Sequence, residues 1–412
     1  MQVLWEREQQ DTFNISDVIK NKKITVHFQP VISPNRKKVL GLEGLVRGLN
    51  TETNQLIPPI LLFDAAQDAG VTLELDRLCR EMVLEAFTGI YEDNKDKLLF
   101  LNIDASILDK VAGSKFLLNQ VNRHKINPNN VVIEVNEIKV QDNAALRNFI
   151  DIYRENGFLI ALDDVGAGFS NLNRIPLAKP DIIKTDMSLI RNIHNDYHKQ
   201  EVFKSMINLA NTIGALVVAE GVETEEEAIQ ILRHGGHMIQ GFYFSRPQEM
   251  YRETDAFLGR KIEILNNSFK EYMNFIIKEE EQRYEQLNTV MSDALMILVR
   301  TPEQHFDNRL AEIVHTNENI ECAYILDAYG IQVGKTISGS DVKENPVFYL
   351  ARTGTDHSMK KYYYRPVNAK LNKYITEPYV SLATGNLCIT YSKVFRNIEN
   401  EKYILCIDFK AT

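Results

Sequence analysis

The sequence predicts an α/β fold: an irregular TIM-type (β/α)8 barrel with one antiparallel strand, then a long helix and a smaller α+β domain. Short apolar runs alternate with helix-like segments over roughly the first 250 residues, which is the size of one barrel. Six runs end in acid, amide or lysine side chains, at Glu43, Asn102, Glu134, Asp163 with Asp164, Lys184 and Glu220. Because the strand ends of a barrel converge on one rim, we expect these side chains to share a pocket.

Eight runs should form the barrel strands. Several are apolar throughout, as expected of parallel strands that are covered on both faces. The runs are Ile24–Phe28, Val39–Leu45, Leu98–Ile103, Val131–Val135, Leu159–Leu162, Ile182–Lys184, Leu216–Ala219 and Met238–Gln240. Only the turn Ser33-Pro34-Asn35 joins the first two runs, which leaves no room for a crossover helix. These two strands should therefore form an antiparallel hairpin.

The segments between the runs have helical periodicity. Leu73–Phe87 carries its apolar residues on one side, and so does Glu201–Ile213. In the second segment the apolar side consists of Val202, Met206, Leu209 and Ile213. These spacings indicate amphipathic helices between the strands.

A longer helix is predicted over Thr254–Val299, which contains no proline and only one glycine. Its apolar residues step by three and four, apart from a charged stretch at Lys278 to Arg283. The helix could pack only on its own domain, or it could also pair two protomers. The predicted division is a barrel over residues 1–250, a connecting helix over 251–300 and a small domain over 301–412.

The small domain should begin at Thr301-Pro302-Glu303, with Thr301 as the helix cap and proline at the first helical position. We read Tyr362-Tyr363-Tyr364 as part of a strand with alternating faces rather than as an aromatic cage. Five further runs are strand-like: Cys322–Leu326, Gly330–Thr336, Tyr374–Thr376, Asn386–Phe395 and Lys402–Phe409. This order of elements indicates an α+β domain.

Composition excludes several classes of protein. The net charge of -9 argues against a nonspecific nucleic-acid binder, which needs a basic face. No stretch of about 18 apolar residues is present, so no membrane span is expected, and the charged segment from Met1 to Phe13 is unlike a signal peptide. The cysteines are far apart in sequence, at positions 79, 322, 388 and 406. We expect reduced, mostly buried thiols in a cytoplasmic protein.

The side chains at the strand ends predict a hydrolytic metal site. Several carboxylates, one amide and one lysine suit hard divalent cations, which prefer oxygen ligands. Histidine and cysteine are scarce at these positions, which argues against structural zinc. Two such cations can neutralise a phosphodiester and activate water. The pattern therefore favours a two-cation phosphodiesterase site.

Motifs at the strand ends resemble a known family. Residues 24–247 resemble the EAL-type cyclic di-GMP phosphodiesterase domain, and the order of the motifs makes the resemblance specific. The matching segments are His27-Phe28-Gln29-Pro30-Val31, Glu43-Gly44-Leu45-Val46-Arg47, Leu101-Asn102-Ile103, Ile133-Glu134-Val135-Asn136-Glu137, Asp163-Asp164-Val165-Gly166-Ala167-Gly168-Phe169-Ser170, Ile183-Lys184-Thr185-Asp186, Ala219-Glu220-Gly221-Val222-Glu223-Thr224 and Gln240-Gly241-Phe242.

The resemblance implies a role for each matched residue. One cation would be held by Glu43, Asn102, Glu134 and Asp163, and a second by Asp163, Asp164 and Glu220. Lys184 would orient or deprotonate the attacking water, Gln240 would position it, and Glu137 would anchor the loop that follows Asp164. The implied contacts to the dinucleotide are Gln29, Leu45, Arg47, Asp186 and Glu223. Alternatives stay open at this stage: Lys184 as a barrel ion pair, Arg47 as a structural salt bridge and Glu223 as a helix cap.

The chain departs from the family pattern at a few places. Gly44 replaces the alanine of the motif, and Val165 and Ala167 replace the usual residues of the paired-aspartate loop. None of these changes removes an implied metal ligand, so we expect an active enzyme. The expected reaction is hydrolysis of cyclic di-GMP to linear pGpG with Mg²⁺ or Mn²⁺, inhibited by Ca²⁺. The alternative is a receptor that binds cyclic di-GMP without hydrolysis and signals through the C-terminal domain. The resemblance also implies a homodimer.

The C-terminal domain resembles a PAS-like sensor module of the PDC or Cache type. The resemblance lies in the segment from Tyr324 to Gly330 and in the strand-like runs that follow residue 364. It implies a regulatory domain that binds a small ligand, for example a carboxylate held by Arg365 and Tyr379. The alternative is a module that mainly mediates dimerisation.

Overall fold

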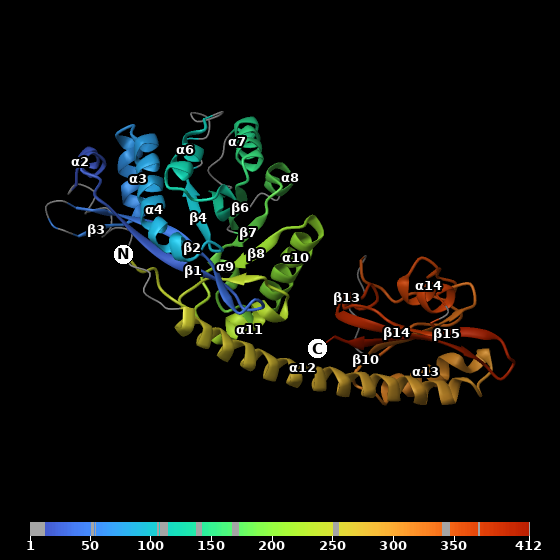
Figure 1. The fold of residues 1–412 in the computed structure, drawn as a ribbon. Helices are drawn as coiled ribbons and strands as arrows, with labels where there is room; N and C mark the ends of the chain where they lie inside the picture. Colours follow the sequence, from blue (N-terminus) through green and yellow to red (C-terminus); the bar gives the residue numbers. More distant parts are fainter. Residues whose placement is uncertain are drawn as a thin grey trace. The chain divides into compact units, whose positions relative to one another are not determined.

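The computed structural model describes residues 13–50, 53, 55–104, 107, 114–136, 142–166, 173–249, 255–339, 347–369 and 371–411. The chain divides into two compact units, Met1–Asn274 and Phe275–Thr412 (Figure 1). Among the described helices, none is both long enough and apolar enough to cross a membrane. The four cysteines are all buried.

The first unit is built on a closed barrel. The strand order is β1-β9-β8-β7-β6-β5-β4-β2-β3, and the pairing of β1 with β2 closes the ring. The strands are β1 (Ile24–Ser33), β2 (Lys38–Leu49), β3 (Leu56–Ile57), β4 (Leu98–Ile103), β5 (Val131–Asn136), β6 (Leu159–Val165), β7 (Ile182–Thr185), β8 (Leu216–Ala219) and β9 (Met238–Ile239). β1 runs antiparallel to both β2 and β9, whereas the pairings from β2 through β4 to β9 are parallel. The irregular barrel with one antiparallel strand is thus confirmed.

Helices flank these strands (Figure 1). They are α2 (Ile15–Lys20), α3 (Pro59–Asp68), α4 (Thr72–Asp93), α6 (Phe116–Arg123), α7 (Asn143–Glu155), α8 (Arg174–Ala178), α9 (Met187–Ile190), α10 (Tyr197–Ile213) and α11 (Glu225–Arg233). One apolar core lies between the helices and the outward strand side chains. A smaller core fills the barrel with inward side chains such as Val132, Ala161 and Val218.

The apolar face assigned to the segment Glu201–Ile213 is wrong. In α10 the buried residues are Phe203, Ile207 and Ala210, whereas Val202 is 50% exposed and Ile213 is 45% exposed. Two apolar stripes lie side by side on this helix, and the stripe that carries the large Phe203 ring packs on the barrel. Spacing alone could not choose between them.

The long helix is α12 (Asp255–Leu298). Near its start Leu258, Ile262 and Leu265 join the barrel core. Near its end Met291 and Leu298, among others, join the core of the second unit. Pairing of this helix with a second protomer stays a prediction.

The second unit contains an antiparallel sheet of order β11-β10-β15-β14-β12, with β13 paired to β14. Its elements are η6 (Glu303–His305), α13 (Phe306–His315), β10 (Ile320–Asp327), β11 (Ile337–Ser338), α14 (Lys361–Asn368), β12 (Lys373–Ile375), β13 (Tyr379–Val380), β14 (Leu387–Arg396) and β15 (Lys402–Lys410). Figure 1 shows α14 on one side of this sheet and α13 on the other.

Three local predictions in this unit are wrong. The run Gly330–Thr336 forms only isolated bridges at Ile331 and Gln332, and the strand β11 follows it. The three consecutive tyrosines lie in α14 and not in a strand. Thr301 does not cap a new helix, because its Oγ1 donates to the carbonyl of Ile297 in the last turn of α12.

Candidate functional site

Strand alternation explains how the site forms. In β4, β5, β6 and β7 an inward core residue is followed two positions later by a polar residue, and residues two apart lie on the same face of a strand. Phe100 precedes Asn102 in this way, and Val132 precedes Glu134. The other pairs are Ala161 with Asp163, Ile182 with Lys184, Val218 with Glu220, and Met238 with Gln240. The polar residues therefore form the layer above the apolar interior of the barrel.

Lys184 lies at the centre of this layer and is only 1% exposed. Its Nζ is 2.5 Å from Oε1 of Glu134 and 2.6 Å from Oε1 of Glu220. It is also 3.4 Å from Oε2 of Glu43 and 3.5 Å from Oδ1 of Asp163. Carboxylates from four different strands thus share one buried ammonium group. The sequence pattern placed Glu43 at a strand end, but β2 continues to Leu49 and Glu43 lies in its middle.

Amide side chains orient Glu43. Asn102 Nδ2 donates to Glu43 Oε1 at 3.0 Å, and Gln240 Nε2 donates to Glu43 Oε2 at 2.5 Å. The same amide nitrogen of Gln240 is 3.2 Å from Oε1 of Gln29. Gln29 in turn donates to the carbonyl of Ser245 at 3.1 Å. Gln29 and Gln240 therefore fix the position of Glu43 in addition to lining the site.

A second part of the site contains three carboxylates that could hold one cation. Oxygens of Asp163, Asp164 and Glu220 lie within 4.8 Å of one another. Asp164 is in the left-handed region, with φ of 57°, which turns its side chain beside that of Asp163. Asn136, at the end of β5, donates a hydrogen bond to Asp164 Oδ2. Backbone conformation and this amide together position the Asp164 carboxylate.

Burial and the closeness of like charges shift the pKa values of the acidic side chains in the site. Burial and the neighbouring charge of Glu43 raise the pKa of Glu134 well above its usual value. Burial, together with the charges of Asp163 and Glu43, raises the pKa of Glu220 to about 8, although Lys184 opposes this. Burial acts on Glu43 too, but Lys184 and the hydrogen bonds from Gln240 and Asn102 leave its pKa lowered. Protons are therefore shared unevenly within this cluster.

Burial and neighbouring charges also shift the pKa values of Lys184 and Asp164. Burial opposes the ammonium form of Lys184, but the surrounding carboxylates, led by Asp163 and Glu134, raise its pKa well above the usual value. Burial and the charges of Asp163 and Asp186 raise the pKa of Asp164. Lys184 is therefore a hydrogen-bond donor in this arrangement.

The donor set fits divalent cations. The site contains five carboxylates, the four around Lys184 and that of Asp164, so one ammonium cannot balance their charge. Within the described part of the chain, Glu134 Oε2 and Gln240 Oε1 are buried oxygens without a hydrogen-bond partner. Unpaired buried oxygens cost free energy, and oxygen ligands are those that Mg²⁺, Mn²⁺ and Ca²⁺ prefer. A cation would relieve both the charge and the missing contacts.

A cavity of about 430 Å³ opens beside the carboxylates and is lined by Glu43, Asn102, Asp163 and Asp164. Its wall also contains two residues that the sequence analysis missed, Asp76 and Arg80 of α4. They form a buried ion pair one helical turn apart, and Asp76 Oδ1 accepts the backbone N–H of Asp104 at 3.1 Å. A charged pair at i and i+4 inside an apolar helical face was the available signal.

The residues that the family resemblance assigns to dinucleotide binding differ in their burial and in the contacts that they make. Leu45 lines the cavity. Arg47 is half-buried and donates to the carbonyl of Val46, and in the described residues it has no ion pair that would make it a structural salt bridge. Asp186 caps α9 by accepting the N–H of Ser188 at 2.9 Å.

Glu223 is exposed and pairs with Arg191 at 2.8 Å. It does not cap the following helix, because Thr224 and Glu227 form the capping box there. Glu137, which we expected to anchor the paired-aspartate loop, lies outside the described residues, as does Ala167.

Comparisons with known proteins support the assignment from the motifs. Residues 13–247, more than half of the chain, match the family model of the EAL domain. Probable cyclic di-GMP phosphodiesterase PdeB of Escherichia coli (strain K12) is 29% identical over 240 residues. That alignment covers 58% of this chain but 46% of PdeB, so the chain spans about half the length of that relative.

The EAL-domain containing protein YkuI of Bacillus subtilis (strain 168) is similar over most of its length. It is 26% identical over 392 residues, which cover 92% of each chain. The crystal structure of YkuI, in complex with substrate c-di-GMP and calcium, superposes with a TM-score of 0.81 at 25% identity. This superposition covers 97% of this chain and 100% of YkuI, so the likeness extends through both units.

Proposed function

The chain belongs to the EAL domain family, and from this premise we propose that it is a divalent-cation-dependent phosphodiesterase that hydrolyses cyclic di-GMP to linear pGpG. The observation that carries the proposal is the buried Lys184 among carboxylates from four different strands. The similarity to YkuI, whose crystal holds c-di-GMP and calcium, supports the choice of substrate.

The proposed ligands follow from the two parts of the site. Glu43, Asn102, Glu134 and Asp163 would hold one cation. Asp163, Asp164 and Glu220, whose oxygens lie close together, would hold the other. When bound, a pair of divalent cations supplies charge neutralisation for the phosphodiester and lowers the pKa of water.

The protein side chains would orient the reactants. Lys184 is an ammonium donor held by four carboxylates, so we assign it to orienting the attacking water. Gln240 fixes Glu43 and presents a free carbonyl oxygen within the site. Arg47 has no carboxylate partner among the described residues and is free to pair with a phosphate, for which a guanidinium group is well suited.

The remaining parts of the proposal come from the family resemblance. They are a homodimer, anchoring of the paired-aspartate loop by Glu137, dinucleotide contacts from Gln29, Leu45, Asp186 and Glu223, and a C-terminal PAS-like module that regulates the barrel. The proposed cytoplasmic location comes instead from the reduced thiols expected at the four cysteines. Ca²⁺ should inhibit, because its larger and looser coordination shell suits the two-cation geometry poorly.

The test is a hydrolysis assay on the purified full chain with cyclic di-GMP and Mn²⁺, in which substrate and pGpG are separated by chromatography. The wild type should form pGpG, and Glu43→Ala should form none. Asp96→Asn is the matched control, because Asp96 is exposed and, among the described residues, its ion pair is with Lys38 on the surface. If the wild type binds cyclic di-GMP but forms no pGpG, the enzyme proposal is wrong and the receptor alternative is correct.

A further inference from the structure

The sheet of the second unit has two unlike faces. On one face Ala323, Ile325, Leu405 and Ile407 pack with α12 and α13 into an apolar core. On the other face β14 and β15 carry polar residues that are almost fully buried, among them Thr390, Ser392 and Asp408. Burial of polar groups is costly without partners. The same face also carries an apolar cluster that includes Leu326 and Ile404, so its buried polar residues need partners of their own.

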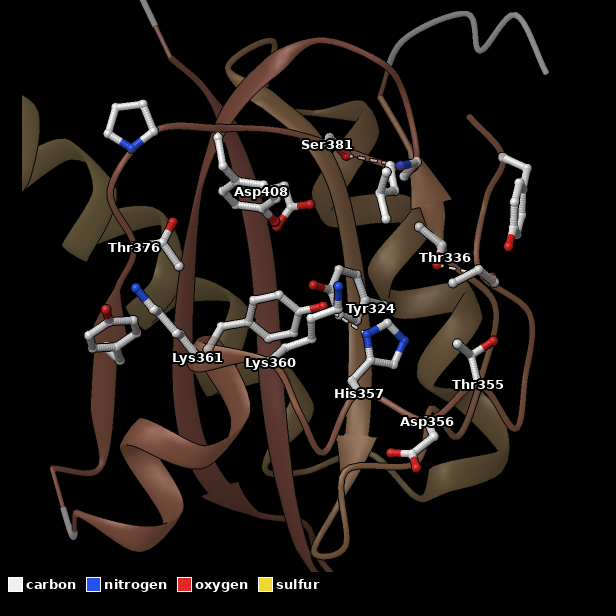
Figure 2. A pocket seen from close by; sticks show the side chains of 18 of the residues that line it. Tyr324, Thr336, Thr355, Asp356, His357, Lys360, Lys361, Thr376, Ser381 and Asp408 are labelled. Atoms are coloured by element: carbon white, nitrogen blue, oxygen red, sulfur yellow. Dashed lines mark hydrogen bonds between the residues drawn. The ribbon is translucent and has the colours of Figure 1, made fainter. Parts of the chain in front are cut away.

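A cavity of about 500 Å³ lies on this polar face. Figure 2 shows Asp408, Tyr324 and His357 around the same hollow, with Lys360 and Lys361 of the α14 end nearby. Much of the wall is aromatic or apolar, and five tyrosines contribute to it: Tyr324, Tyr349, Tyr362, Tyr374 and Tyr379. The cavity therefore offers aromatic rings and one buried carboxylate.

In the described residues, the Asp408 carboxylate is the acceptor in each of its side-chain hydrogen bonds. Thr390 Oγ1 donates to Asp408 Oδ1 at 2.7 Å, and Cys322 Sγ donates to Oδ2 at 3.3 Å. Because the single hydroxyl proton of Thr390 is used in this way, Tyr379 must donate in its own 2.6 Å contact with Thr390. These donors favour a charged carboxylate, but each is neutral.

No cation of the described residues neutralises Asp408. Its hydrogen-bond partners are a hydroxyl and a thiol. Lys360 and Lys361 are exposed. His357 is bonded to Tyr362 at 2.8 Å and Gln332 at 3.1 Å, and its pKa is lowered to about 4 by burial, so it is neutral. A buried carboxylate without a counter-charge is costly unless a ligand supplies the charge.

We propose that this cavity binds a small organic ammonium ion, with Asp408 as its counter-ion and the surrounding tyrosine rings as its cage. Tyrosine faces attract cations most strongly where water is excluded, and the buried carboxylate gives the charge its direct partner. A carboxylate ligand held by Arg365 is less well supported, since Arg365 is exposed and does not line the cavity.

The test compares three probes of one skeleton: 2-phenylethylamine, 2-phenylethanol and phenylacetate. Binding to the full chain is measured by isothermal titration calorimetry at about pH 7.5, where a primary amine is protonated. The amine should bind at least about tenfold more tightly than the alcohol or the acid. Asp408→Asn should weaken amine binding about tenfold and leave alcohol binding within about threefold. Asp293→Asn, at an exposed acid of α12 that does not line the cavity, is the matched control and should change neither.

The wild type alone provides a second readout, in case Asp408→Asn does not fold. Burial raises the pKa of Asp408 to about 6, so amine affinity should fall as the pH drops through that value. The facing groups Tyr324, Tyr362, Tyr379, Cys322, Cys388 and Cys406 stay neutral in this range, because burial raises the pKa of each. Glu321 is the other facing acid. The charged rim residues are Asp356, Lys360, Lys361 and Glu377.

Each remaining outcome overturns the proposal. Tighter binding of phenylacetate than of the amine would assign the cavity to anions. If a folded Asp408→Asn variant binds the amine as tightly as the wild type does, Asp408 is not the counter-ion. Absence of saturable amine binding, or amine affinity that does not change between about pH 7.5 and pH 5, would also refute it.

Discussion

Lys184 Nζ lies 2.5 Å from Glu134 Oε1, and both side chains are almost fully buried. The ammonium group comes from the end of β7 and the carboxylate from the end of β5. Removal of Lys184 would leave Glu134 buried without its ammonium partner, whereas removal of Glu134 would still leave Lys184 beside three other carboxylates. This contact therefore links the stability of the barrel rim to its proposed chemistry.

Lys184→Met keeps most of the side-chain volume and removes the charge. We expect kcat to fall by about 10²–10⁴-fold, the range for loss of a positioned donor or base. Lys38→Met is the matched control, since the ion pair of Lys38 in the described part of the chain is with exposed Asp96. Steady-state hydrolysis of cyclic di-GMP with Mn²⁺ measures both, and a Lys184→Met kcat within threefold of the wild type would contradict the assigned role.

Gly44 occupies the position of the alanine in the family motif, but this chain leaves no room for a methyl group. A Cβ on Gly44 would lie 2.3 Å from Cγ1 of Val83, and Val83 is a buried β-branched residue of α4 with little rotamer freedom. Gly44→Ala should lower the free energy of unfolding by about 1–3 kcal/mol.

The double variant Gly44→Ala/Val83→Ala checks that prediction, because it removes the clashing methyl group. It should be more stable than Gly44→Ala combined with Val121→Ala, another buried valine of the same core. Denaturant titration compares these variants. If the Val83 change gives no advantage, the clash is not the cause.

The ion pair between Asp76 and Arg80 stabilises the wall of the barrel cavity. Arg80→Met leaves Asp76 buried without its counter-charge, so we expect a loss of about 3–5 kcal/mol in unfolding free energy. The double variant Asp76→Asn/Arg80→Met should recover part of that loss, because no lone charge remains. Thermal and denaturant unfolding provide the measurement, and additive losses in the double variant would show that the pair is not coupled.

Asp408 should make the stability of the second unit depend on pH. Its pKa is raised from 3.8 to about 6 by burial, so the folded state binds a proton more tightly than the unfolded state. Stability from this source is complete below pH 3.8 and is lost as the pH rises through about 6, with a total of about 3 kcal/mol. Asp408→Asn should lack this dependence.

Hydrogen exchange of the β15 amides, compared between wild type and Asp408→Asn at each pH, isolates that effect. The difference in protection between the two proteins should change most between about pH 4 and pH 6. A constant difference across this range would mean that Asp408 does not carry a raised pKa.

The strand-end residues could be predicted from sequence because two simple rules combine. Strand alternation fixes which side chains point inward, and closure of the barrel brings the strand ends together. Glu134 and Lys184 followed from these rules without any knowledge of contacts. The antiparallel hairpin of β1 and β2 followed from a turn too short for a helix.

Other features depend on packing that no local pattern contains. The tyrosines at 362–364 have strong strand propensity, but they lie in α14 and cover the sheet, an example of tertiary context overriding propensity. The pair Asp76 and Arg80 was hidden because only the apolar residues of its helix were considered. Asp408 lies in an apolar run, and its position on the cavity side depends on what covers each face of the sheet.

The most direct test is an anomalous difference map from crystals of the full chain grown with Mn²⁺. Crystals of the Glu43→Gln variant, grown in the same way, provide the comparison. We expect two manganese peaks in the wild type, one beside Glu43, Asn102 and Glu134 and one beside Asp164 and Glu220, with Asp163 between them. The first peak should be lost or weakened in the variant. Full Mn²⁺ occupancy elsewhere with none among these carboxylates would contradict the account.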